Sequence, residues 1–286
     1  MPPVFLYSKV VLHWGFIVRQ LGASAAQLAY ALPPPPTVVG AFANPLARIL
    51  GLGEEVDRRL APAGSRVMAC ALKATLAAAA GLGGPVGSAV HAEPSRIAAA
   101  LYKTGGDYSR ALREPAYLAA DRLLPVQAEG AASAPGAILH LAWLVDLEGL
   151  SACLSEAYGR GVSVSSREAL AAAWSVYRLG SREGLASTVV ARLYGAGELE
   201  ELGEGSAFES ILYQHADCVE PGEPVASVTL YDSSYREAVY YVPSGPSGPS
   251  VVSPPARPAL FEARSGCRVV RPHGRGELAI AYRARG

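Results

Sequence analysis

The chain has 286 residues, half of them hydrophobic, with 25 basic and 25 acidic side chains. This length and hydrophobic content are enough for a substantial core, which excludes a largely disordered chain and allows one large domain or two small ones. A formal net charge of zero argues against binding to nucleic acid through overall charge alone.

The charges are unevenly distributed along the chain. Residues 1–53 contain no Asp or Glu, and residues 257–286 contain seven arginines against two glutamates. Between Glu198 and Glu223 there are eight acidic residues and no Lys or Arg. This asymmetry allows a basic face for phosphates and an acidic face elsewhere, which would dock a basic partner. Ordinary solvated charge explains the same pattern.

The cysteines and the apolar segments indicate the compartment. The four cysteines are widely spaced: Cys70, Cys153, Cys218 and Cys267. Because none of them forms a CxxC pair, we expect neither a zinc site nor a secreted disulfide scaffold. The apolar N-terminus is interrupted by Lys9, and the longest apolar region contains Lys73. We therefore expect a soluble, cytoplasmic protein without signal peptide, membrane span, metal or cofactor.

The first expected element in chain order is a long strand over Val4–Val18, which is rich in β-branched and aromatic side chains. Pro33–Pro36 form a rigid extended segment, and Thr37 is a suitable N-cap for the helix that follows. Pro45 predicts a kink or an early break in that helix. An alanine-rich helix is expected from about Ser65 to Ala80.

The middle of the chain predicts several strands and two helices. The expected strands are Arg96–Tyr102, Ala116–Val126, Ala137–Asp146 and Leu185–Tyr194, and the expected helices are Leu150–Tyr158 and Ser166–Trp174. Up to about residue 195 the order is strand, helix, several strands, helix, strand. That order predicts an α+β fold with a ferredoxin-like βαββαβ core that carries insertions.

The last third of the chain has the patterns of strands. Val225–Tyr231 and Ala238–Val242 alternate, and residues 243–255 form a flexible Pro/Gly/Ser loop. Cys267–Arg271 and Glu277–Tyr282 are expected to form a hairpin. We therefore divide the chain into a region 1–195 and a β-rich C-terminal region 196–286.

Enzyme signatures are absent from the sequence, which contains no P-loop, HExxH or GxSxG motif. His140 lies in an apolar run and is expected to be a core residue, whereas His13 suits a structural role or stacking on RNA. A metal-independent endoribonuclease would need a general base and a cation near the ribose. The group that the sequence offers for this is His91 with Tyr102 and Lys103.

One segment interleaves cations with tyrosines around a glycine hinge. It contains Lys103, Tyr108, Arg110 and Arg113. Cations neutralise phosphates, and aromatic faces stack on unpaired bases, so this composition suits RNA. An ordinary exposed hairpin would have the same composition.

A second segment places Arg178 and Arg182 on either side of Gly180, where a predicted helix ends. Exposed backbone N–H groups and guanidinium groups near a glycine suit contact with phosphate. A helix C-terminus with basic residues near the negative end of its dipole explains the same pattern.

Three segments, taken together, resemble one family. They are Pro33–Ala41 (PPPPTVVGA), Arg113–Leu118 (REPAYL) and Tyr177–Glu183 (YRLGSRE). Their order and spacing resemble the fifth family of CRISPR-associated proteins, in the RAMP superfamily, and most of all its archaeal subtype I-A branch. The resemblance spans roughly Val4 to Tyr194, and the acidic tract and the C-terminal third lie outside it.

The resemblance implies a modified RNA-recognition (RAMP) fold with a β-thumb, about residues 96–126, and a variable β-rich C-terminal part. It also implies a non-catalytic subunit of a type I Cascade complex in antiviral defence. This subunit would bind the 5′ handle of the crRNA and cap the backbone of the complex, beside the backbone RAMP subunit and the large subunit. In one other subtype the family member is itself the endoribonuclease that cuts the precursor; in the I-A branch a separate nuclease is expected to cut.

The resemblance and the residue chemistry together give one set of candidate RNA-binding residues: Lys9, His13, Arg19, Thr37, Gly40, Lys103, Tyr108, Arg110, Arg113, Arg178 and Arg182. Within this set, the helix N-terminus over Thr37 to Gly40 is expected to present free N–H groups to phosphates. Lys103 to Arg113 are expected on the thumb, where they would also contact the backbone subunit. No catalytic residue is expected.

Overall fold

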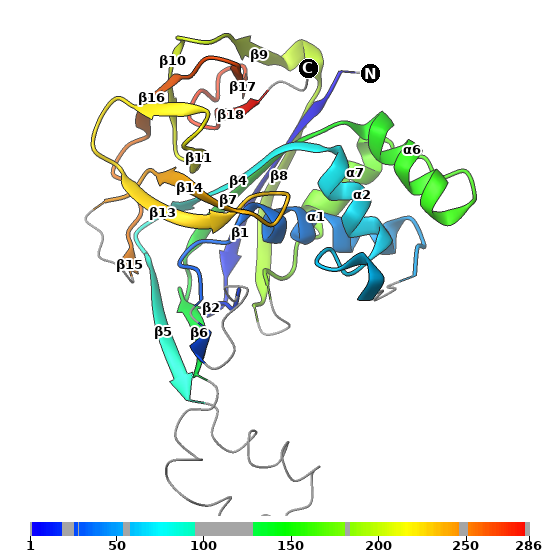
Figure 1. Ribbon diagram of the computed structural model, residues 1–286, viewed down its shortest axis with the longest axis horizontal. Coiled ribbons are helices and arrows are strands. Elements are labelled where there is room, and N and C mark those ends of the chain that lie inside the picture. Colours follow the sequence, from blue (N-terminus) through cyan, green and yellow to red (C-terminus); the bar gives the residue numbers. More distant parts are fainter. Residues whose placement is uncertain are drawn as a thin grey trace, which may run out of the picture.

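The computed structural model describes residues 2–18, 26–27, 29–53, 58–94, 128–180, 184–245 and 251–283, which form a mixed α+β fold (Figure 1). The helices are α1 (Pro35–Ile49), α2 (Arg66–Ala74), α6 (Leu147–Tyr158) and α7 (Ser166–Trp174), with short 3₁₀ turns at Arg58–Leu60 and Ala196–Glu198. Within these ranges, no helix combines the length and the apolar character needed to cross a membrane.

A four-stranded sheet, here called the main sheet, forms the centre of the molecule. Its strands are β1 (Val4–Leu12), β4 (Thr75–Gly83), β7 (Ile138–Val145) and β8 (Ala186–Tyr194). Their spatial order is β4-β7-β1-β8, and every neighbouring pair is antiparallel. Along the chain the order is β1, α1, α2, β4, β7, α6, α7, β8, so helices connect β1 to β4 and β7 to β8.

One face of the main sheet is covered by helices. Strand residues alternate between faces, and Ser8 of β1 donates a hydrogen bond to the Ala173 carbonyl of α7 over 2.8 Å. On the same face, Trp143 of β7 is fully buried and its indole N–H donates to the Val38 carbonyl of α1 over 2.8 Å. The odd-numbered residues of β1 therefore point to the opposite face, here called the open face because α1 and α7 pack on the other one. On this face Phe5 and Tyr7 are nevertheless buried, whereas Lys9 is partly exposed.

Helix α1 begins earlier than the sequence predicted. Its N-cap is Pro34 rather than Thr37, and Pro35 and Pro36 are its first two residues. Proline is well tolerated there because the first N–H groups of a helix have no intrahelical partner. The helix then runs through Pro45 to Ile49 as one element, so the expected early break does not occur.

The expected helix over Ser65–Ala80 is wrong in its second half. Helix α2 is capped by Ser65, whose hydroxyl accepts from the Met68 N–H, but it ends at Ala74. Strand β4 follows at once and pairs with β7, because the ladder and the burial it provides outweigh the helix propensity of alanine. Small side chains are also needed here: a Cβ at Gly81 would overlap the Ile211 carbonyl.

The expected first strand also ends earlier, because β1 stops at Leu12 and the chain bends at His13 and Trp14. A second sheet then starts, with strands β2 (Gly15–Phe16), β3 (Ala26–Gln27), β5 (Ser88–Pro94), β6 (Ala128–Ser133) and β15 (Val251–Val252). In it, β5 and β6 form an antiparallel ribbon that extends away from the main sheet (Figure 1).

In the sequence, β5 directly precedes the expected thumb and β6 directly follows it. The chain leaves β5 at Pro94 and enters β6 at Ala128, and these two residues are paired. The strands expected over residues 96–102 and 116–126 lie outside the described residues, so the thumb stays a prediction.

Beyond β8, the described residues form three small antiparallel sheets, and the sequence patterns predicted four of their strands. Their orders are β18-β17-β9, β10-β16-β12 and β11-β14-β13. The strands are β9 (Leu199–Leu202), β10 (Ala207–Ser210), β11 (Gln214–His215), β12 (Val219–Pro221), β13 (Ala226–Tyr231), β14 (Glu237–Val242), β16 (Ala259–Ala263), β17 (Cys267–Pro272) and β18 (Ile280–Arg283). The predicted hairpin near the C-terminus corresponds to β17 and β18.

Half of the acidic residues between Glu198 and Glu223 are paired with arginines of the same region. Glu200 and Arg271 are 2.9 Å apart, Glu201 and Arg268 are 2.7 Å apart, and Glu223 pairs with Arg257. These pairs are mostly exposed to solvent, so each contributes little to stability. Together with Glu220 and Arg264, they pair four of the eight acidic residues of the tract with arginines of the same region.

All four cysteines are paired, contrary to the expectation from their spacing. Cys70 of α2 is bonded to Cys153 of α6, and Cys218 to Cys267, with Cα–Cα distances of 5.5 and 5.4 Å. The sequence did not indicate these bonds, because each joins residues that only the tertiary fold brings together, 83 and 49 positions apart. One bond fastens two helices, and the other fastens the C-terminal strands.

We expect both disulfides to stabilise the fold by restricting the unfolded chain. The variant C70S/C153S should lose roughly 3–4 kcal/mol in free energy of unfolding, because the bond closes a long loop. Urea unfolding of the oxidised protein and of this variant measures the difference, and mass spectrometry of alkylated, unreduced protein counts free thiols. Four free thiols, with unchanged stability of the variant, would contradict the pairing.

Candidate nucleic-acid interface

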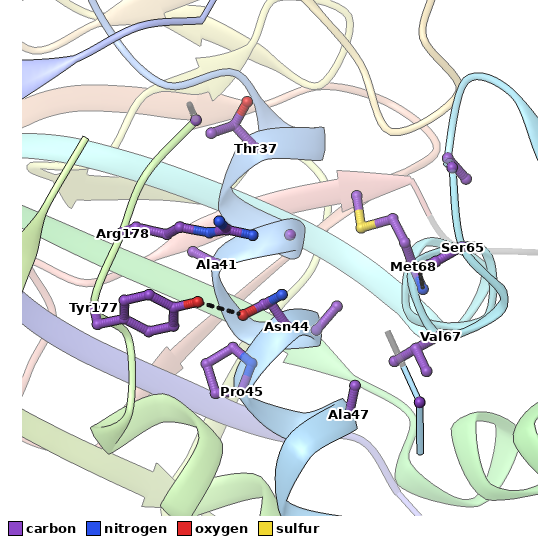
Figure 2. Close-up of a pocket in the computed structure, with 16 residues that line it drawn as sticks. Thr37, Ala41, Asn44, Pro45, Ala47, Ser65, Val67, Met68, Tyr177 and Arg178 are labelled. Carbon is purple, nitrogen blue, oxygen red and sulfur yellow. Dashed lines mark hydrogen bonds between the residues drawn. The ribbon is translucent and has the colours of Figure 1, made fainter. Parts of the chain in front are cut away.

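A cleft of about 400 Å³ lies between α1, the N-terminal turn of α2 and the segment after α7 (Figure 2). The wall from α1 is one face of the helix, with Thr37, Gly40, Ala41 and Asn44 at helical spacing. The opposite walls include Ser65 to Met68 and the segment Tyr177 to Gly180. Two of the three segments that carry the family resemblance, far apart in sequence, therefore line one cleft.

Tyr177 and the arginines around it give this cleft its polar chemistry. The Tyr177 hydroxyl donates to Asn44 Oδ1 over 3.0 Å, which ties the segment after α7 to α1 (Figure 2). The guanidinium groups of Arg48 and Arg178 lie 5.2 and 5.6 Å from the centre of the Tyr177 ring. Of these two arginines, Arg178 lines the cleft, and a guanidinium group held against an aromatic ring can still bind a phosphate oxygen.

Gly40 keeps the cleft open. It lies in the middle of a fifteen-residue helix, where glycine costs about 1 kcal/mol relative to alanine. A Cβ at this position would lie 3.7 Å from Met68 Sδ, an ordinary contact, so crowding does not require glycine. The absence of a side chain at this position leaves the space between α1 and Met68 open.

The N-terminus of α1 does not present free N–H groups as expected. Pro35 and Pro36 have no N–H group, and the N–H groups of Thr37 and Val38 both donate to the Pro34 carbonyl, over 2.9 and 3.1 Å. Because the helix starts two residues earlier than predicted, its first donors are removed or paired. The contribution of Thr37 to the cleft is its side chain alone.

Gly180 fixes the position of the segment after α7. It has a φ of 71°, in the left-handed region that glycine adopts readily, and forms a parallel bridge with Ile17. A Cβ here would overlap the Ile17 carbonyl. The interpretation of Gly180 as a simple helix end is therefore incomplete, because the residue joins the cleft to the chain that leaves the main sheet.

The open face of the main sheet carries a second set of candidate residues. Lys9 of β1 pairs with His140 of β7 and with Val190 of β8. His13, just beyond the strand, is exposed, and its Nε2 lies 2.9 Å from the Ser187 hydroxyl. Lys9 and His13 are thus at one end of this face, and both are available to a strand of nucleic acid.

His140 belongs to a polar group rather than to a purely apolar core. The Tyr7 hydroxyl and His140 Nδ1 are hydrogen-bonded at 2.7 Å, and the Arg275 guanidinium lies 5.7 Å from the centre of the Tyr7 ring. Burial, together with the charges of Lys9 and Arg275, lowers the pKa of His140 to about 4. Burial raises the pKa of Tyr7 to about 12, so both side chains are uncharged at neutral pH.

The sequence analysis missed three residues of the open face. Arg192 of β8 lies directly opposite Tyr7, is exposed, and places a second cation near Lys9. Tyr194 lies two residues further on the same face and packs against Phe5. Arg275 comes from the turn before β18. The alternation of β8 could have indicated Arg192 and Tyr194, whereas only the tertiary fold brings Arg275 to this face.

The other candidates lie outside the described residues: Arg19, Lys103, Tyr108, Arg110, Arg113 and Arg182. The same holds for Tyr102, which with His91 and Lys103 formed the possible nuclease group; the backbone of His91 is part of β5. In the part of the chain that the structure describes, no three His, Cys, Asp or Glu side chains are grouped so as to hold a metal ion.

Comparison with known proteins gives a likeness in fold. No protein-family model and no curated protein sequence matches this chain. Among solved structures, it is similar to the crystal structure of a CRISPR protein from Archaeoglobus fulgidus, with a TM-score of 0.54 and 15% sequence identity. The match covers 99% of this chain and 100% of that chain, so the likeness includes the C-terminal strands.

The environment of His140 predicts a measurable pH dependence. Its folded pKa of about 4 is below the usual 6.5, so between these values protons bind the unfolded chain but not the folded one. Stability from this group is complete above pH 6.5 and is lost as pH falls toward 4, by about 3 kcal/mol in total. Urea unfolding across this range should show a smaller loss for H140Q than for wild type. Equal losses in the two proteins would contradict the buried, neutral His140.

Proposed function

We propose that this chain is a non-catalytic subunit of a type I CRISPR surveillance complex, which binds the 5′ handle of the crRNA and caps the backbone of the complex. The observation that carries the proposal is the likeness in fold, over 99% of this chain, to a CRISPR protein from Archaeoglobus fulgidus. The family resemblance of Pro33–Ala41 and Tyr177–Glu183 supports the same conclusion independently of the fold.

The topology of the main sheet supports a RAMP assignment. A βαββαβ chain order with the first strand in the interior of an antiparallel sheet is the arrangement of ferredoxin-like domains. Here β1 lies between β7 and β8, and β4 is at an edge. The ribbon β5/β6 extends from this sheet between the second and third core strands, where the resemblance puts the thumb (Figure 1).

The two candidate surfaces suit single-stranded RNA. Phosphates require cations, and unpaired bases stack on flat side chains. The cleft offers Arg178 beside the Tyr177 ring. The open face offers Lys9 and Arg192, with Tyr194 two residues beyond Arg192 on the same face. We assign the handle to these surfaces, and the thumb to contact with the backbone RAMP subunit; the large subunit would be the other protein neighbour.

The central prediction is that charge reversal on these surfaces weakens RNA binding. For K9E/R178E we expect at least a tenfold loss of affinity for handle RNA, because two charge-assisted contacts are removed. The slope of log affinity against log salt should fall by about 1.4, since each phosphate contact to a single strand contributes about 0.7. Fluorescence anisotropy of labelled handle RNA measures both quantities.

The matched control is R160E/R167E, which reverses two exposed arginines of the helical layer. Its affinity should stay within about twofold of wild type, because long-range effects are screened by salt. G40L adds a steric test, since it fills the cleft without a change of charge and should weaken binding with little change in the salt slope. Equal losses in the control and in K9E/R178E would mean that the contact is not specific to these surfaces.

The competing function is a metal-independent endoribonuclease that processes precursor crRNA. Purified protein incubated with repeat RNA and EDTA separates the two functions. We expect the RNA to remain intact, because we propose that the chain binds the processed end without cutting it. A cleavage product with a fixed 5′ end, abolished in H91A, would establish the nuclease in its place.

A further inference from the structure

A second cavity, of about 480 Å³, lies between the β4 edge of the main sheet and the C-terminal strands. We propose that this cavity, here called the junction pocket, holds a single unstacked nucleotide of the bound RNA. The proposal rests on the function proposed above and extends it to the C-terminal region, to which sequence analysis assigned no role. Its volume is within the range of small-molecule sites, which is enough for one base and its ribose phosphate.

One wall of the junction pocket is the open edge of a sheet. Residues Leu76–Ala79 line it, and β4 is an outer strand of the main sheet. Ala80 directs its carbonyl away from β7, where it accepts from the Tyr213 N–H over 2.9 Å. Because alternate residues direct their backbone groups to the same edge, Ala78 presents an N–H and a C=O on this side. Adjacent donors and acceptors of this kind match the edge of a nucleobase.

The arginines of the C-terminal region distinguish this pocket from the rest of the surface. Of the seven arginines in described residues 196–283, five have acidic partners within 4 Å: Arg257, Arg264, Arg268, Arg271 and Arg275. The other two, Arg236 and Arg283, both line the junction pocket, and no ion pair engages them within the described ranges. Both are exposed, so their guanidinium groups are available to a phosphate.

Aromatic side chains complete the pocket. Tyr240, Tyr282 and His215 line it, and the rings of His215 and Tyr240 pack edge to face with centroids 5.0 Å apart. His215 Nδ1 accepts from the Asp217 N–H over 3.1 Å, which places the proton of the neutral ring on Nε2. Burial lowers the pKa of His215, so the ring is a neutral donor and stacking surface.

Two features hold the pocket walls rigid. Gln214, fully buried next to His215, donates to the Ala279 and Leu212 carbonyls over 3.0 Å and accepts from the Ala281 N–H over 2.9 Å. In the wall turn 232–236, Asp232 Oδ1 accepts from the Ser234 and Arg236 N–H groups. Tyr235 of this turn has a φ of 58°, a left-handed conformation that a tyrosine adopts at a cost. Strained backbone conformations of this kind cluster at functional sites.

An extended peptide could also add to the β4 edge, but the pocket favours a nucleotide. Only four residues of the edge line it, which is short for an added strand. The other walls combine apolar, aromatic and charged side chains, and the charged ones include Asp217 and Asp232 as well as the two arginines. Asp232 Oδ1 already accepts from two backbone N–H groups, and a carboxylate can accept from the amino group of a base. Two exposed guanidinium groups in the same pocket as tyrosine rings suit a phosphate and the base attached to it.

The test compares two pairs of arginines in the full-length protein. R236A/R283A removes the cations of the junction pocket, and R257A/R264A removes two arginines of the same region that have acidic partners. The probe is a short, fluorescein-labelled single-stranded RNA of mixed sequence, measured by anisotropy as a function of salt. For R236A/R283A we expect affinity to fall at least tenfold and the salt slope to fall by about 1.4, with the control within about twofold of wild type.

Ultraviolet crosslinking of the same RNA, read by mass spectrometry of peptides, gives a second measurement. Crosslinks to Tyr240 or Tyr282 support the pocket. Unchanged affinity of R236A/R283A without such crosslinks overturns the proposal. A strand-forming peptide could instead protect the β4 amides from hydrogen exchange and leave RNA binding unaffected. That result would assign the edge to a protein partner. Absence of RNA binding by the wild-type chain would contradict the proposed function itself, which distinguishes the two failures.

Discussion

The architecture depends on how Tyr213 joins the C-terminal strands to the main sheet. This side chain is fully buried; its hydroxyl donates to the Pro33 carbonyl over 3.0 Å, and its backbone N–H donates to Ala80 of β4. The close approach requires glycine at position 81, because the Ile211 carbonyl occupies the place of a side chain. One tyrosine thus connects the entry to α1, the edge of the main sheet and the C-terminal region. Substitution of Tyr213 should lower the free energy of unfolding, because a buried partner such as the Pro33 carbonyl would lose its hydrogen bond.

The distribution of charge follows from this architecture. The acidic tract and the C-terminal arginines, widely separated in sequence, come together on neighbouring strands and neutralise each other, as Glu200 and Arg271 do across β9 and β17. Among the described residues, no ion pair engages Arg178 at the cleft, or Arg236 and Arg283 at the junction pocket. A chain of zero net charge can therefore still offer local cationic sites to RNA, because the sum of charges does not determine where individual arginines lie.

The sequence predicted strands β7, β8, β13 and β14 and helix α7 nearly to the residue. The spacing of apolar residues and the helix-capping residues that define these elements are local features of the sequence. It failed over residues 75–83, where an alanine run became strand β4 through pairing with β7, a long-range effect. For the site, the resemblance identified Gly40 and Arg178, and the fold brings them to one cleft. No local sequence pattern indicated the position of Arg275 or the junction pocket, because both are formed where regions distant in sequence meet. The division into regions 1–195 and 196–286 stays a prediction.

The most direct test of the central claim is to co-express this chain with its backbone RAMP subunit and a CRISPR array, purify through a tag on this chain, and sequence the retained RNA. The account predicts RNA species that share one fixed 5′ end, and their loss in K9E/R178E but not in R160E/R167E. Recovery of the chain without RNA, or with RNA whose 5′ ends are random, would contradict a role in binding the handle of the guide.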